Sequence, residues 1–134
     1  MFLTTKHGRR AGALPLFIGM AASMSVASAA AQLDISGNYG NAAGCAHVAG
    51  DQFTNDELFY LTPTEVATYA TGCTFLDVWS TDDRGQVAAV MCAHEGGEEI
   101  TLGMMRFEKD WERPDAVRIF HQNGELWGNL ERCP

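Results

Sequence analysis

Residues 74–93, TFLDVWSTDDRGQVAAVMCA, are the stretch of sequence that decides the fold. Residues 74–80 and 86–93 are rich in β-branched, aromatic and other apolar side chains, as strands commonly are. They flank residues 81–85, TDDRG, a short polar segment that ends in glycine. We therefore predict a β-hairpin in which Gly85 takes the left-handed conformation that such a turn requires.

Further short strands are predicted on both sides of this hairpin. Residues 122–124, QNG, contain an Asn-Gly pair, which is the strongest short signal for a tight hairpin turn. The other predicted strands are residues 33–39, 53–61, 100–107, 117–121 and 125–130. Seven or eight short strands at this spacing predict an all-β fold, a small antiparallel barrel or sandwich. Barrel closure would place the first strand, 33–39, beside the last, 126–130, and so hide both sheet edges.

Helix is expected to be scarce, at most one short segment. Residues 62–65, TPTE, fit a capping box with proline at the first helical position and predict a turn or two of helix to about Tyr69. The β-branched residues in this segment leave a strand open as the alternative. Residues 41–52 are rich in glycine, alanine and polar side chains, and we expect them to form a loop around Cys45.

Residues 1–31 have the order of a secretory signal peptide. Basic residues (Lys6, His7, Arg9 and Arg10) precede an apolar stretch at 11–22, and a small-residue run ends at Ala31. The apolar part is shorter than the roughly 20 residues of a membrane span. The residues after Arg10 lack a bulky apolar pair, so general secretion is favoured over the twin-arginine route. We predict export to the periplasm or the medium, with residues 32–134 as a single domain.

All four cysteines lie in that predicted domain, and an even count in a short exported chain predicts two disulfides. Cys73 and Cys92 lie at the open end of the first hairpin, whereas Cys45 follows the first strand and Cys133 follows the last. We favour the pairing 73–92 with 45–133. The alternative is 45–73 with 92–133.

The chain is acidic, with a formal net charge of −8. Without the predicted leader, six Lys and Arg face seventeen Asp and Glu, a net charge of about −11. Such a charge repels nucleic acid and anionic membranes and favours basic partners or cations. Solubility alone is the simpler explanation of the charge.

A repeated tripeptide suggests a metal site as an alternative function. Cys45-Ala46-His47 and Cys92-Ala93-His94 would each place sulfur and imidazole on one face of a strand, and together they would make a Cys₂His₂ set for zinc. Thioethers would favour cuprous copper instead, and they are supplied by Met91, Met104 and Met105. Oxidation of the thiols opposes this interpretation, so we predict no metal or cofactor. In the alternative, in which a metal is bound, His47 and His94 are the predicted ligands.

Catalysis has little support in the sequence. Neither serine of residues 32–134 lies in a G-x-S-x-G turn, and nothing links His47, His94 or His121 to a nucleophile and an orienting acid. The carboxylates of residues 95–99, EGGEE, lack the order of a calcium loop. We therefore predict a monomeric binding protein, with a small hydrolase of unrecognised site as a further alternative.

The predicted partner-binding residues are Trp111 with its neighbours Asp110 and Glu112, together with Glu98 and Glu99. A tryptophan between two acids in a charged turn is expected to be exposed and to serve as an anchor for a basic partner. Trp79 and Trp127, in the middle of predicted strands, are expected in the core.

Residues 35–41, ISGNYGN, followed by Gly44 and Cys45, resemble small exported bacterial proteins of unestablished activity. The same opening is similar to the first strand of avidin-like and lipocalin-like barrels, although Tyr39 stands where lipocalins have tryptophan. More broadly, the chain resembles small periplasmic barrel inhibitors of lysozymes or proteases. This resemblance implies a barrel fold and inhibition of a cationic hydrolase through an acidic surface.

Overall fold

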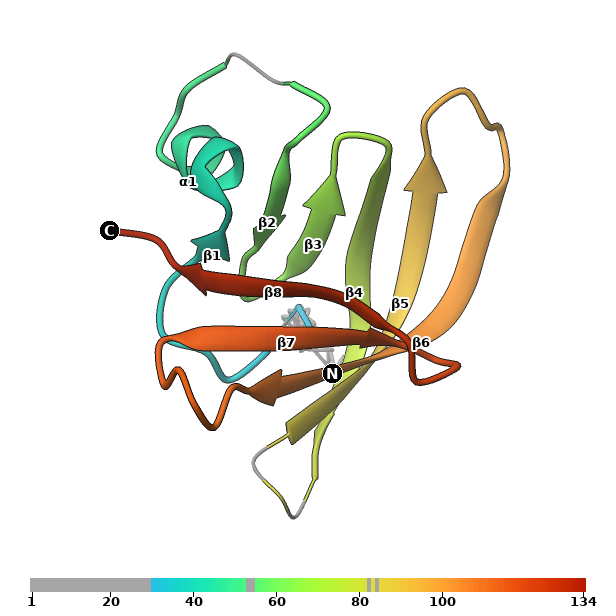
Figure 1. Cartoon of the computed structure of the whole chain (residues 1–134). Coiled ribbons are helices and arrows are strands. Elements are labelled where there is room, and N and C mark those ends of the chain that lie inside the picture. Colours follow the sequence, from blue (N-terminus) through green and yellow to red (C-terminus); the bar gives the residue numbers. More distant parts are fainter. Residues whose placement is uncertain (1–29, 53–54, 82, 84) are drawn as a thin grey trace, which may run out of the picture.

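Over its described residues, the protein is a closed, eight-stranded antiparallel β-barrel with one short helix, as predicted (Figure 1). The computed structural model describes residues 30–52, 55–81, 83 and 85–134, so nearly all of the predicted leader lies outside the described residues. The elements in chain order are β1 (Tyr39–Gly40), α1 (Ala42–Val48), β2 (Phe59–Leu61), β3 (Glu65–Thr68), β4 (Thr71–Ser80), β5 (Gly85–His94), β6 (Ile100–Lys109), β7 (Ala116–His121) and β8 (Leu126–Arg132).

Strands β4 and β5 form the predicted central hairpin, and a bulge between Phe75 and Asp77 shifts their register. Gly85 begins β5 and does not take the left-handed conformation that we predict. Glycine fits this position because there is little space for a side chain: an added Cβ would lie 2.8 Å from the Thr81 hydroxyl oxygen. The predicted Asn-Gly turn joins β7 to β8, with Gly124 at φ +84° and the His121 amide donating to the Glu125 carbonyl.

The barrel closes where β1 pairs with β8, so the expected adjacency of first and last strands is confirmed. The first strand is much shorter than predicted, because only Tyr39 and Gly40 of the segment pair. Leu33 instead enters the core, and the segment is held by Leu33 N–H donating to the Pro63 carbonyl and by Asp34 N–H donating to the Gln86 side chain. This segment therefore fills the end of the barrel at the β2–β3 and β4–β5 turns.

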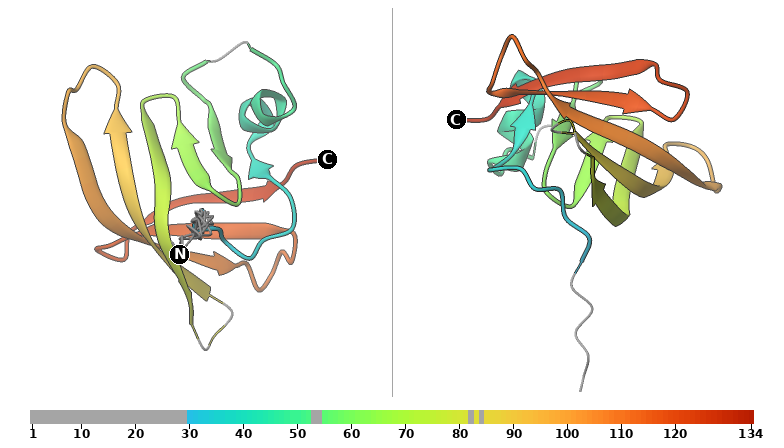
Figure 2. Two further views of the ribbon diagram at one scale, coloured as in Figure 1. Left: turned by 180° about the vertical axis from the view of Figure 1, so that it is seen from behind. Right: turned by 90° about the horizontal axis from the view of Figure 1, so that it is seen from below.

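The interior is made of apolar side chains from every wall, and Phe75 meets Phe107 edge to face with ring centroids 5.3 Å apart. Figure 2 shows the strands β7 and β8 crossing the other strands at a steep angle, so that the two groups enclose this core. The largest fully buried side chains are Phe107, Leu61, Ile119, Val66, Val90 and Cys73. Among the described residues, no helix has the length and hydropathy that a membrane span requires.

Two local predictions are wrong. Residues 41–52 contain helix α1 rather than a loop alone; Asn41 is its N-cap, and the Asn41 side chain accepts a hydrogen bond from Gly44 N–H at 2.8 Å. Residues 62–69 contain strand β3, which is the alternative left open for this segment, rather than the helix that we favoured. The Thr62 hydroxyl does accept a hydrogen bond from Glu65 N–H, at 3.2 Å, but the chain forms a turn there and no helix follows.

Two disulfides join Cys45 to Cys133 and Cys73 to Cys92, which is the favoured pairing and not the alternative. Cys73 and Cys92 are directly opposed in the β4–β5 ladder. Disulfides of this kind are consistent with an oxidising compartment.

Candidate binding pocket at the open end of the barrel

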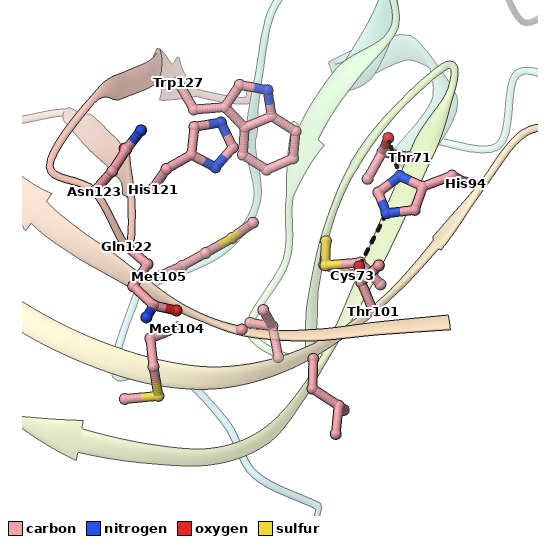
Figure 3. A pocket seen from close by; sticks show the side chains of 14 residues that line it. Thr71, Cys73, His94, Thr101, Met104, Met105, His121, Gln122, Asn123 and Trp127 are labelled. Carbon is pink, nitrogen blue, oxygen red and sulfur yellow. Dashed lines mark hydrogen bonds between the residues drawn. A yellow bond between two sulfur atoms is a disulfide. The ribbon is translucent and has the colours of Figure 1, made fainter. Parts of the chain in front are cut away.

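A pocket of about 410 Å³ opens at the end of the barrel opposite the buried Leu33 segment. Its walls are the start of β4, the end of β5 and the start of β6 on one side, and the turn between β7 and β8 on the other (Figure 3). Pockets in the mouths of β-barrels are common sites of ligand binding. This pocket is therefore the candidate functional site.

The floor of the pocket is apolar. The Cys73–Cys92 disulfide and Val90 lie there with Met105, whose side chain is only 6% exposed. Gly103 leaves room above this floor, since an added Cβ would meet Val90 and Gln122 only at 3.9 and 4.0 Å, which is ordinary contact. The floor is suited to an apolar group.

His94 stands on one side of the pocket between two threonine hydroxyls. Its Nδ1 lies 3.0 Å from Thr71 Oγ1, and its Nε2 lies 3.0 Å from Thr101 Oγ1 (Figure 3). A hydroxyl both donates and accepts, so this clamp holds the ring in either tautomer. Neither nitrogen faces a carboxylate in these contacts, so the geometry of a nucleophile, base and orienting acid is not assembled around His94.

His121 and Trp127 form the opposite wall. Their ring centroids are 5.0 Å apart with planes inclined by 31°, and Trp127 also contacts Phe59 at a centroid distance of 5.0 Å. Trp127 is half-buried, so our expectation of a core position is only partly met. The sequence gives no signal for this aromatic wall, because β7 and β8 bring the two rings together only through the turn between them.

The two Cys-Ala-His tripeptides do not converge as the zinc hypothesis requires. All four sulfurs are in disulfides. Cys45-Ala46-His47 lies on α1 rather than on a strand, and the His47 ring stacks on Tyr60 at 5.1 Å instead of entering the pocket. Within the described part of the chain, no group of three or more His, Cys, Asp or Glu side chains is placed to hold a metal ion.

Asp110, one of the predicted partner-binding residues, is buried, because it is only 8% exposed. One oxygen accepts from the Glu112 and Arg113 amides at 2.9 and 3.2 Å, and the other accepts from the Asn129 side chain at 2.8 Å. The Asn129 hydrogen bond is the main cause that lowers the pKa of Asp110, and the two amides and the Arg113 charge act in the same direction. Asp110 thus organises the β6–β7 loop.

Trp111 is 75% exposed, as predicted, and Glu112 beside it is exposed. Glu98 and Glu99 are also exposed, but they lie in the β5–β6 loop at the other end of β6. Ten residues of strand separate the two groups, which is about 30 Å. The predicted partner-binding residues therefore form two surfaces, and only the β5–β6 loop adjoins the pocket, through His94 and Thr101.

Trp79 is 47% exposed on the outer face of β4, so its predicted core position is wrong. The bulge after Phe75 shifts the register by one residue, and alternation counted from the start of the strand then assigns the wrong face. In comparisons with family models, curated proteins and solved structures, the chain shows no significant match.

Proposed function

We propose that this protein is an exported binding protein whose open barrel end receives an apolar group of a positively charged partner. The observation that carries the proposal is the position of the pocket: an apolar floor lies next to the exposed, acidic β5–β6 loop. Apolar contact would supply affinity, and the charged rim would select for cationic partners.

Three features support this assignment. The chain has an excess of eight acidic charges, which favours basic partners over nucleic acid or anionic membrane surfaces. The signal-like residues 1–31 and the two disulfides fit an exported protein in the periplasm or the medium. A rigid, disulfide-bonded barrel presents a pocket at little entropic cost on binding.

We infer that the partner is a cationic hydrolase that reaches the same compartment, and that binding inhibits it. In this arrangement a lysine- or arginine-rich loop of the hydrolase meets Glu98 and Glu99, and an adjacent apolar side chain enters the pocket. Such an interface associates quickly at low salt and more slowly as salt screens the rim.

The test is to measure binding of the purified protein to a panel of cationic hydrolases, lysozyme among them, at low and physiological salt. Gly103→Leu should fill the pocket, since the position has space and a normal backbone angle, and it should abolish binding. Gly72→Leu is the matched control, because a Cβ added at Gly72, in strand β4, would meet no atom within 4 Å and Gly72 does not line the pocket.

The charged rim is tested by the double variant Glu98→Gln with Glu99→Gln. We expect slower association at low salt and little change at high salt, because the two charges act at long range. A complex that Gly103→Leu leaves intact would contradict the role of the pocket. Absence of any complex across the panel would remove the inhibitor assignment.

A further inference from the structure

Met105 and His121 are directly opposed in the β6–β7 ladder. Opposed residues of antiparallel strands share a face, with Cβ atoms about 4.5–5.5 Å apart. Both side chains line the pocket, and Figure 3 shows the Met105 thioether directed toward the His121 and Trp127 rings. A thioether, an imidazole and an indole face are thus brought together at one wall.

We propose that Met105, His121 and Trp127 form a binding site for one soft monovalent cation, cuprous copper or silver. Thioether sulfur and imidazole nitrogen are ligands that suit cuprous copper. The indole face of Trp127 adds cation–π attraction to a charge held beside it. Soft monovalent cations accept two strong ligands, so no third side chain is required.

The surroundings of the three residues favour this ligand. Within the described residues, no hydrogen bond occupies the ring nitrogens of His121, whereas both nitrogens of His94 face threonine hydroxyls. The Met105 side chain is buried in the pocket floor, where water does not compete strongly for the metal. The negative charge of the chain raises the local concentration of cations.

This site differs from the metal alternative drawn from the sequence. His47 and His94 are not its ligands: His47 stacks on Tyr60, and His94 is held by Thr71 and Thr101. Of the methionines singled out with them, Met91 is exposed and Met105 alone faces His121 across the ladder. The site does not depend on the proposed protein partner.

The experiment is a titration of the purified protein with silver nitrate in chloride-free buffer, followed by tryptophan fluorescence. Trp79 and Trp111, both exposed, are first replaced by phenylalanine so that Trp127 is the sole reporter. We expect quenching that saturates at one equivalent of silver. The same titration with zinc should leave the fluorescence unchanged, because a thioether is a poor ligand for zinc.

Two conservative variants test the ligands. Met105→Leu keeps the volume of the side chain, and His121→Phe keeps the ring contact with Trp127. We expect each to weaken silver binding by about tenfold or more. Met91→Leu is the control for binding by an exposed methionine and should bind like the parent.

A second measurement does not depend on the variants. In the parent protein, the Met105 methyl resonance should shift on addition of one equivalent of silver, and the Met91 methyl resonance should not. Unchanged silver affinity in both Met105→Leu and His121→Phe would overturn the proposal. So would loss of binding in Met91→Leu, equal quenching by zinc, or an unmoved Met105 methyl resonance.

Discussion

The disulfide between Cys45 and Cys133 joins helix α1 to the residue that follows β8, across 88 positions of sequence. It lies beside the shortest strand of the barrel, β1, which pairs with β8 through only Tyr39 and Gly40. The Cys133 amide also donates to the Asn38 carbonyl at 2.8 Å. A short ladder is thus reinforced by a covalent link where the barrel closes.

Replacing both Cys45 and Cys133 by alanine should strongly destabilise the protein. In the chain-entropy model, a loop of this length contributes about 4–5 kcal/mol, compared with about 3 kcal/mol for the 19-residue separation of Cys73 and Cys92. Denaturant unfolding of the two double-alanine variants measures both values. Amide exchange should accelerate at β1 in the Cys45→Ala, Cys133→Ala variant. An unchanged midpoint of unfolding would show that the pairing of β1 with β8 does not need the disulfide.

Gly44→Ala should destabilise the protein although alanine is the better helix former. An added Cβ would lie 2.0 Å from the Phe59 carbonyl oxygen and 2.6 Å from its carbonyl carbon, so α1 would have to move away from β2. We expect a loss of about 2–3 kcal/mol, against the gain of about 1 kcal/mol that helix propensity alone predicts. Thermal melting decides between the two signs. Ala46→Gly, in the same helix, is the control and should cost about 1 kcal/mol.

The strands could be predicted because their signals are local. The β-branched, aromatic and apolar content of residues 74–80 and 86–93, the polar segment between them and the Asn-Gly pair at 123–124 specify hairpins without reference to the rest of the chain. Barrel closure followed from the need to hide sheet edges, and the structure pairs β1 with β8 accordingly.

Helix α1 could not be predicted, and strand β3 could be predicted only as the alternative to a helix, because non-local contacts decide both. The sequence of α1, AAGCAHV, contains glycine, cysteine, histidine and valine, which have low helix propensity. The helix therefore depends on the Asn41 cap, on the close approach of Gly44 to Phe59 and on the disulfide at Cys45. In residues 62–65 the Thr62 hydroxyl accepts amide hydrogen bonds as a helix cap does. Pairing of Val66 with both Leu61 and Cys73 nevertheless forms a strand.

The pocket could not be predicted from the sequence either. Met105 and His121 are sixteen positions apart, and only the register of β6 and β7 places them opposite each other. His94 was singled out for its neighbour Cys92, but its actual partners are Thr71 and Thr101 on strands β4 and β6. Sequence spacing identifies residues that share a strand face, whereas a site made from several strands depends on their register.

Asp110→Asn should reduce stability at neutral pH. It should also make stability vary less with pH in acid solution. The folded-state pKa of Asp110 lies below its unfolded value of about 3.9, chiefly because Asn129 donates to the carboxylate. Between these two pKa values the unfolded chain binds more protons, so this stabilisation is complete above the unfolded value and disappears as pH falls through the folded one.

Melting temperatures of the Asp110→Asn variant and the parent, measured from neutral pH down to about pH 3, should therefore converge in acid. Asp115→Asn is the control, since Asp115 is exposed in the same loop. A constant difference across the range would show that Asp110 stabilises the loop by hydrogen bonding that does not depend on its charge.

Tyr60→Phe should remove a tyrosine ionisation near pH 12. Partial burial is the main cause that raises the pKa of Tyr60 to about 12, and two effects of the Glu65 carboxylate contribute to the same value. The carboxylate accepts a hydrogen bond from the Tyr60 hydroxyl, with 3.0 Å between the two oxygens, and its charge repels the phenolate. The unfolded value is about 10, so the stabilisation is complete below pH 10 and is lost as pH rises through about 12. Phenolate absorbance of the folded protein should show this late step in the parent and in Tyr69→Phe, where an exposed tyrosine is removed, but not in Tyr60→Phe. Persistence of the step in Tyr60→Phe would assign it to another tyrosine and would argue against the Tyr60–Glu65 hydrogen bond.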